Sequence, residues 1–212
     1  FGAVGIADHL LEALCDQGAR DLTIVANNAG NDEHGLARLI NLGRVRKVIC
    51  SYPRSGDYKA FLEAYRARTL ELELVPQGTI SERMRCAAAG LGGFFSPVSA
   101  GTKLAEGKET RIIDGRLHVF EKPLRGDVAL VKAARADRWG NLVYRKSARN
   151  FNPVCAMAAD LTIVETEAMV ELGSLDPEAV VTPGIFVDRI VEVGLLPPRN
   201  HPMYAKLAGA AA

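Results

Sequence analysis

Amide side chains stand at two points where the sequence leaves a strand-like run. In "VANNAGND", Asn27 and Asn28 follow the run 21–27, and in "VPQGTISER", Gln77 follows the run 71–76. Ligands of open α/β sheets bind outside the carboxyl ends of the strands. Amide N–H groups can donate to an oxyanion that develops on an acyl group. An amide at either point, Asn27 or Asn28 at the first and Gln77 at the second, could thus donate to an anion, whereas an asparagine in a turn usually bonds only its own backbone.

Two glycine-rich segments are further candidates for ligand contact. "FGAVGIADHL" places Gly2 and Gly5 in a turn before a helical pattern, where helix N–H groups can receive a phosphate. The full G-x-G-x-x-G fingerprint is absent, so tight packing is an equal alternative. "AAAGLGGFFSPVSAGT" carries Phe94 and Phe95, whose rings either line a pocket or are buried in a core.

The residues that would complete an active site around these donors are missing. The sequence has no G-x-S-x-G elbow, no P-loop and no evident base near the amides. Glu165 and Glu167 follow a strand-like run and are conceivable nucleophiles, although a charge at a strand end more often has a structural role. Donors without a nucleophile indicate half an active site, with the attacking group supplied by a second chain.

Composition narrows the class of protein. The 212 residues are 48% hydrophobic and 24% charged, with a formal net charge of +1. No apolar run is long enough to span a membrane, and the charge balance does not favour nucleic-acid binding. The four cysteines lie far apart without a C-x-x-C pair, and the four histidines lack metal-ligand spacing. We therefore expect a cytoplasmic protein with reduced thiols and no metal.

Strand and helix patterns alternate along the chain. The apolar runs are rich in Val, Ile and Leu on consecutive residues, as in strands covered on both faces. This alternation predicts an α/β fold with an open, mostly parallel sheet and helices on both faces. The expected strands are 21–27, 47–52, 71–76, 127–133 and 161–166, and the expected helices are 6–16, 34–42, 57–68 and 79–89.

Several local signals refine this plan. Asp114-Gly115 between alternating apolar residues predicts a type I′ hairpin. Gly140-Asn141 predicts a longer hairpin or arm within 130–150. A Thr79-to-Glu82 capping box is expected to start one helix, and Asn152 before Pro153 is expected to cap another. We expect one domain over 1–195 and a C-terminal tail over 196–212.

Several long blocks resemble one enzyme family in order and content. "FGAVGI", "LTIVANNAG", "ELELVPQGTISERMR", "GDVALVKAARADRWGNLVYRKSARNFNP" and "IFVDRIVEV" look like the small (A) subunit of bacterial 3-oxoacid CoA-transferases, and most like the 3-oxoadipate branch. The family opens with G-G-F-G, which would place its first strand upstream of Phe1. Ile6-Ala7-Asp8 departs from the family's I-P-E, and "SPVSAG" departs from T-P-T-G-x-G.

The resemblance implies a fold, a reaction and roles for residues. A glutamate of the partner B subunit would carry CoA from succinyl-CoA to a 3-oxoacid, within a heterotetramer of two A and two B subunits. CoA thioester would be a substrate, with no permanently bound cofactor. Asn27 and Gln77 would be the oxyanion donors. CoA and substrate contacts would come from Phe1, Gly2 and Gly5 in the turn, and from Asn28, Gly30 and Gly78.

Three questions stay open at this point. The acceptor is either 3-oxoadipate or acetoacetate; Trp139 favours the first, and Arg138, Arg145 and Arg149 are candidate partners for its second carboxylate. A nucleotide- or sugar-phosphate-binding enzyme would use the glycine turn. A non-catalytic acyl-CoA-binding protein on the same fold is the remaining alternative.

Overall fold

The first parallel sheet is built from the N-terminal half of the chain. The structure, a computed structural model, describes residues 3–30, 34–54 and 58–195. Helices α1, α2 and α3 pack their apolar residues against one face of this sheet, with Val48 and Cys50 at the centre of the core. The sheet has the order β1-β2-β3, and its elements are α1 (Asp8–Gln17), β1 (Leu22–Val25), α2 (Gly35–Asn41), β2 (Val45–Cys50), α3 (Lys59–Arg66) and β3 (Glu71–Leu74).

The second sheet comes from the C-terminal half. Its order is β10-β9-β7-β8, and all pairs are parallel except β7 with β8. Helix α5 covers it, and Val131, Leu142 and Val164 are fully buried between them. The elements are β7 (Gly126–Asp137), β8 (Leu142–Val143), α5 (Asn152–Met157), β9 (Ala159–Val170) and β10 (Arg189–Glu192).

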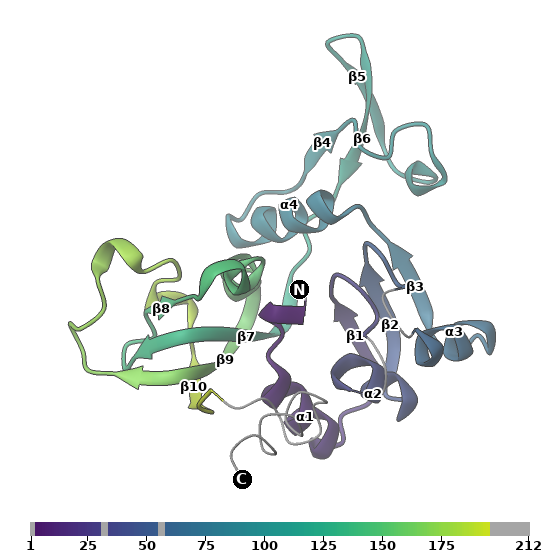
Figure 1. The fold of residues 1–212 in the computed structure, drawn as a ribbon. Coiled ribbons are helices and arrows are strands. Elements are labelled where there is room, and N and C mark those ends of the chain that lie inside the picture. Colours follow the sequence, from purple (N-terminus) through teal and green to yellow (C-terminus); the bar gives the residue numbers. More distant parts are fainter. Residues whose placement is uncertain (1–2, 31–33, 55–57, 196–212) are drawn as a thin grey trace.

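A small antiparallel sheet extends from the rest of the molecule (Figure 1). It has the order β4-β6-β5, with β4 (Phe94–Ser96), β5 (Thr110–Ile113) and β6 (Arg116–Glu121). Asp114 and Gly115 both have positive φ, +48° and +73°, which confirms the predicted type I′ turn. Phe95 packs on Phe120 with ring centroids 5.1 Å apart.

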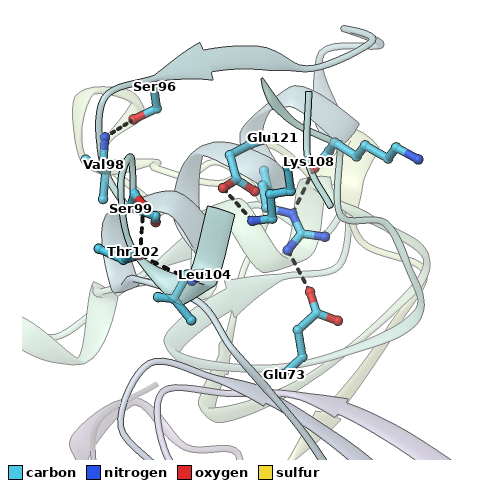
Figure 2. Close-up of polar contacts among 10 residues, drawn as sticks. Glu73, Ser96, Val98, Ser99, Thr102, Leu104, Lys108 and Glu121 are labelled. Atoms are coloured by element: carbon cyan, nitrogen blue, oxygen red, sulfur yellow. Dashed lines mark hydrogen bonds and ion pairs between the residues drawn. The ribbon is translucent and has the colours of Figure 1, made fainter. Parts of the chain in front are cut away.

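Helix α4 (Gln77–Ala88) joins the three sheets. Its Ile80 and Met84 pack against Ile49 and Val75 of the first sheet and Ala158 beside the second. Arg83 also bonds the Glu73 carboxylate at 3.0 Å and the Lys122 carbonyl at 2.8 Å. Figure 2 shows Glu73 and the Lys108–Glu121 ion pair on either side of this junction. Helix α4 is therefore held to the two parallel sheets by buried apolar contacts, and Arg83 links it to the chain leaving the antiparallel sheet.

Short 3-10 helices complete the described chain. They are η1 (Ala3–Gly5), η2 (Lys103–Ala105), η3 (Lys146–Arg149), η4 (Pro177–Ala179) and η5 (Gly184–Phe186). In the described ranges, no helix is both long and apolar enough to cross a membrane. All four cysteines are free thiols.

The α/β class predicted from the sequence is confirmed, with several differences in detail. The parallel strands form two sheets, because apolar runs mark buried strands without indicating which strands pair. The Thr79 capping box is wrong: α4 already begins at Gln77 after Pro76, and Thr79 is buried inside it. Asn152 is not an N-cap, since α5 begins at Asn152 itself and no side chain caps it. The predicted hairpin is short, because β7 and β8 pair at only two positions.

Candidate functional site

Asn27 lies just beyond the carboxyl end of β1, and its amide orientation is set by a neighbouring strand. Its backbone carbonyl accepts hydrogen bonds from the N–H groups of Ser51 and Tyr52, at 3.2 and 3.1 Å. Its Oδ1 accepts from Ser51 Oγ at 2.8 Å. Because the oxygen side of the amide is occupied, the Nδ2 donors face away from Ser51. No described residue accepts from them, so they are available to a ligand.

Gln77 is the first residue of α4 and follows the carboxyl end of β3. Pro76 is the N-cap and, as a proline with φ of −54° and ψ of 141°, fixes the direction in which the chain leaves the strand. The Gln77 side chain is exposed, and no other described residue bonds its amide. The backbone N–H groups at the start of α4 add positive potential beside it.

Asn27, Ser51 and Gln77 form what we call the donor edge. The three strands they follow are parallel and adjacent, so their carboxyl ends meet at one edge of the sheet. The ends of β1 and β3 are two strand spacings apart, or about 10 Å. Two amides that far apart reach the same small acyl group only when it lies between them, over the end of β2. The donor edge can therefore hold one anionic acyl group.

Asn28 and Gly30 shape the loop that carries Asn27. Asn28 Oδ1 accepts from the Gly30 N–H at 2.9 Å and closes a local turn. Gly30 has φ of +84°, and a Cβ there would lie 2.5 Å from the backbone nitrogen of Ala37. Asn28 is therefore a turn asparagine that bonds the local backbone, which was one of the two alternatives from the sequence. Asn27 is not, because its side chain bonds Ser51 instead.

Gly78 has a different environment. It is exposed, and a Cβ built on it would meet no heavy atom within 4 Å. Nothing in the described chain therefore requires glycine at this position. A close approach at Gly78 would have to involve a ligand or a partner chain.

The N-terminal glycine turn is packed tightly against the second half of the chain. Gly5 is buried, and a Cβ there would lie 2.2 Å from Asn150 Nδ2. The Gly5 carbonyl accepts from Asn152 Nδ2 at 3.1 Å. Phe1 and Gly2, also predicted to contact CoA, lie outside the described residues. Tight packing against Asn150 is therefore sufficient to explain the glycine at position 5.

The first turn of α1 already holds an anion of the protein itself. The N–H groups of His9 and Leu10 donate to Glu165 Oε2 at 2.9 and 3.1 Å. These two donors are consequently not free for the phosphate that the sequence pattern suggested. Glu165 is 1% exposed, and burial raises its pKa to about 7, against the opposing effects of the two N–H groups and of Lys132.

Neither glutamate of "IVETEAM" is placed as a free nucleophile. Both lie on β9, in the second sheet, whereas the donor edge belongs to the first. Glu165 is inaccessible and already bonded. Glu167 is ion-paired with Arg145, which also removes Arg145 from the set of unengaged arginines. Arg138 and Arg149 are exposed.

The loop after β4 is held by its own hydroxyl groups (Figure 2). Ser96 Oγ accepts from the Val98 N–H, and Thr102 Oγ1 donates to the Ser99 carbonyl at 2.8 Å. Ser99 has φ of +74°, and its buried hydroxyl has no described hydrogen-bond partner. Phe95 packs within the antiparallel sheet, which favours a structural role for that ring.

Trp139 is displayed on a rigid turn. Buried Asp137 accepts hydrogen bonds from the backbone N–H groups of Trp139 and Asn141 and from the Asn141 side chain, at 2.8–3.0 Å. The indole is 66% exposed, and Ile185 nearby in the fold is 84% exposed. A Cβ built at Gly184 would lie only 1.9 Å from the Trp139 carbonyl oxygen. The segment that carries Ile185 is therefore in contact with the turn at Trp139.

An open groove of about 560 Å³ lies on the α3 side of the first sheet, beginning at Ser51. Its lining is mainly apolar and aromatic, with arginines among it, and includes Tyr52, Arg54, Phe61, Tyr65, Arg66 and Leu74. No sequence pattern indicated this groove, because its residues come from three separate segments. Ser51 was also missed, since a serine after a strand carries no distinctive pattern.

Fold and site together define a mixed α/β protein with amide donors at the carboxyl edge of parallel strands, one of them held by a serine hydroxyl. Residues 1–193 match the coenzyme A transferase family model. The chain therefore belongs to the coenzyme A transferase family.

The relatives narrow this assignment. The chain is 58% identical over 193 residues to the A subunit of 3-oxoadipate CoA-transferase from Pseudomonas putida, covering 91% of this chain and 84% of the relative. It is 52% identical to the protein of the same name from Acinetobacter baylyi, covering 95% and 89%. The A subunit of a probable succinyl-CoA:3-ketoacid coenzyme A transferase from Bacillus subtilis is 48% identical, covering 90% and 79%.

Solved structures share the fold at low sequence identity. An Escherichia coli O157:H7 acyl-CoA transferase (YdiF), solved as a thioester complex with CoA, superposes with a TM-score of 0.75 at 21% identity, covering 91% of this chain and 42% of that one. Glutaconate coenzyme A-transferase from Acidaminococcus fermentans gives 0.70 at 22% identity, covering 89% and 66%. At these identities, the likeness supports the fold alone.

Proposed function

We propose that this chain is the A subunit of a CoA-transferase that moves CoA from succinyl-CoA to 3-oxoadipate, giving succinate and 3-oxoadipyl-CoA. The observation that carries the proposal is the donor edge: two amide groups with free donors, Asn27 and Gln77, follow parallel strands of one sheet and flank one position. The names of the relatives from Pseudomonas putida and Acinetobacter baylyi support the reaction and the acceptor.

The partner chain supplies a glutamate in this scheme. Its carboxylate attacks the thioester carbonyl of succinyl-CoA, and CoA thiolate leaves to give a mixed anhydride. The thiolate then attacks the glutamyl carbonyl, releasing succinate and leaving a glutamyl-CoA thioester. The 3-oxoacid carboxylate attacks that thioester, CoA thiolate leaves, and a second mixed anhydride forms. The thiolate then attacks the 3-oxoacyl carbonyl of this anhydride, which gives the 3-oxoacyl-CoA and restores the glutamate. Covalent catalysis thus divides one transfer into easier steps.

Each attack passes through a tetrahedral oxyanion, which is the species the donor edge stabilises. Asn27 donates through Nδ2 while Ser51 holds its Oδ1, so the amide needs no reorientation as charge develops. Gln77 donates from the start of α4, where the helix dipole adds positive potential. Free donors in the ground state are suited to this role, because their best acceptor exists only in the transition state.

The partner is a B subunit, and we propose a heterotetramer of two A and two B chains in the cytoplasm. The names of the relatives, which designate one of two kinds of subunit, support a second chain. The exposed Trp139 and Ile185 are suitable anchors for that interface, since buried tryptophans often dominate binding energy. CoA thioester is a substrate of this enzyme, and no permanently bound cofactor takes part.

The test is CoA transfer from succinyl-CoA to 3-oxoadipate, measured with this chain alone and then in the presence of its B subunit. Activity that requires both chains is the expected result. Activity from this chain alone would contradict the assignment of the nucleophile to the partner. Binding of acyl-CoA by the complex without turnover would favour a non-catalytic acyl-CoA-binding protein.

Acetoacetate is the second candidate acceptor, favoured by the name of the Bacillus subtilis relative. The two acids differ by a carboxylate, for which the exposed Arg138 and Arg149 are the unengaged candidates, because Arg145 is paired with Glu167. A kcat/KM ratio that favours 3-oxoadipate, and that falls in Arg138→Ala or Arg149→Ala, is the expected outcome. A preference for acetoacetate would reassign the substrate.

A further inference from the structure

The segment from Gly5 to Leu10 connects the two parallel sheets. Helix α1 packs its apolar side on the first sheet, through Leu11, Leu14 and Cys15. The turn that precedes α1 is bonded to the second half of the chain through Asn152, and the first turn of α1 is bonded to it through Glu165. We call Gly5, His9, Leu10, Asn152 and Glu165 the α1 attachment. It fixes the glycine turn relative to both halves of the protein.

Glu165 replaces the local cap that α1 lacks. The N-cap residue is Ala7, whose side chain cannot accept a hydrogen bond from the first turn. Glu165 accepts from the His9 and Leu10 N–H groups across 156 and 155 residues of sequence. A buried carboxylate at a helix N-terminus satisfies exposed donors and matches the helix dipole. The position of this helix start therefore depends on β9.

Asn152 makes the complementary contacts from α5. Its Oδ1 accepts from the Lys132 N–H of β7 at 3.0 Å. Its Nδ2 donates to the Gly5 carbonyl at 3.1 Å and to the Ala148 carbonyl at 2.9 Å. The side chain is 4% exposed, so each lost bond would leave a buried polar group unsatisfied. The amide thus joins η1, η3 and β7 at one point.

Asn152 and Glu165 are linked through Lys132 of β7, whose backbone N–H donates to Asn152. Lys132 of β7 is the direct cross-strand partner of Glu165 on β9. The Glu165 carboxylate lies 3.7 Å from His9 Nδ1, and its Oε1 has no hydrogen-bond partner among the described residues. Lys132 and Asp8 are the other charges that act on it. A buried charge is costly unless it is paired and hydrogen-bonded, and here the bonds are those to the start of α1.

We propose that Glu165 and Asn152 are positioning residues for CoA: they hold the turn at residues 3–5 in the orientation that contacts the CoA thioester. This inference rests on the proposed function and on the contact between that turn and CoA that the resemblance to the CoA-transferases implies. The two residues act through the backbone of the turn and touch neither CoA nor the reacting atoms. Their loss should therefore weaken CoA binding more than it slows the chemical steps.

The experiment uses the reconstituted complex of this chain with its B subunit. Glu165→Ala removes the acceptor of both hydrogen bonds, Glu165→Gln keeps an acceptor oxygen without the charge, and Asn152→Asp keeps the Lys132 contact but loses the donors to Gly5 and Ala148. Glu192→Ala is the control, because Glu192 also accepts from a backbone N–H distant in sequence, but that N–H belongs to Met169 of β9 and not to α1. Kinetics, calorimetric titration with CoA, and hydrogen exchange of residues 6–12 are measured for each.

Glu165→Ala and Asn152→Asp should raise the KM for succinyl-CoA and the Kd for CoA about tenfold, with kcat changed by less than about threefold. Glu165→Gln should recover most of the binding, and Glu192→Ala should match the wild type. In Glu165→Ala, the amides of His9 and Leu10 should exchange faster. A purely structural role would lower stability without this selective change in KM.

Two results would overturn the inference: unchanged amide exchange in Glu165→Ala, or faster exchange with unchanged CoA affinity. If wild-type protein and B subunit transfer no CoA, the proposed function fails. The titration with CoA would then still decide the inference, since equal affinity of wild type and Glu165→Ala, or no binding by either, contradicts it.

Discussion

The donor edge and the α1 attachment use polar side chains in opposite ways. At the donor edge, Gln77 is exposed and the Asn27 Nδ2 has no described acceptor. At the attachment, Asn152 uses both ends of its amide and is almost fully buried. The amides proposed to receive a transient charge are kept free, whereas the Asn152 amide, which fixes geometry, is satisfied and buried. Glu165 is buried too, although only its Oε2 accepts hydrogen bonds. Among the amides, hydrogen-bond satisfaction therefore distinguishes the two roles better than residue type does.

The largest effect is expected at the donor edge itself. If Gln77 is the oxyanion donor that we propose, Gln77→Ala should lower kcat by about 10²–10³, or roughly 3–4 kcal/mol. Because Gln77 is exposed and bonds no described residue, the melting temperature of the complex should stay near that of the wild type. Steady-state kinetics measures kcat, and thermal unfolding measures the melting temperature. An unchanged kcat would remove Gln77 from the catalytic set.

The pH dependence of stability tests the attachment. Burial raises the pKa of Glu165 from the ordinary 4.5 to about 7 in the folded protein, with Lys132 and the two N–H groups opposing and Asp8 reinforcing the shift. The folded state therefore binds this proton more tightly, and the associated stability is lost as pH rises through about 7.

Glu165→Gln does not titrate at this position. Between about pH 5 and pH 8, its stability should therefore rise relative to the wild type by up to about 3 kcal/mol. Urea unfolding of both proteins at the two pH values measures the difference. A stability difference that does not change with pH would mean that the Glu165 pKa is not raised by folding.

A smaller loss of kcat is expected from Ser51, which orients the Asn27 amide at the donor edge. Ser51→Ala leaves the backbone bonds to Asn27 but removes the hydroxyl that holds Oδ1. The loss of one hydrogen bond is worth about 1 kcal/mol, so kcat should fall by less than about tenfold. The measurement is the kcat of Ser51→Ala compared with the kcat of Asn27→Ala. If Ser51→Ala is as damaging as Asn27→Ala, the serine has a direct part in the reaction.

The smallest effect should come from the second glutamate of the pair. Glu167 is ion-paired with an exposed Arg145, and such pairs contribute about 0–1 kcal/mol. Glu167→Gln should therefore shift the free energy of unfolding by less than about 1 kcal/mol and leave kcat for CoA transfer within about twofold. A loss of activity comparable with that of Gln77→Ala would show that Glu167 is chemically involved.

Sequence reasoning could predict the donor edge because its signals are local. A strand, an amide and a glycine or helix start are contiguous around Asn27 and Gln77, and parallel strands bring their carboxyl ends together. The α1 attachment was beyond such reasoning. Glu165 and His9 lie 156 residues apart, and only the pairing of β7 with β9 brings them together. The division into two sheets was missed for the same reason, since apolar runs do not specify strand order.

The central claim is that this chain supplies oxyanion donors and its partner supplies the nucleophile. The most direct measurement is to incubate the complex with succinyl-CoA and no acceptor, reduce the glutamyl thioester with borohydride, and locate the modified residue by mass spectrometry. We expect one modified glutamate, in the B subunit. A modified Glu165 or Glu167 in this chain would contradict the account.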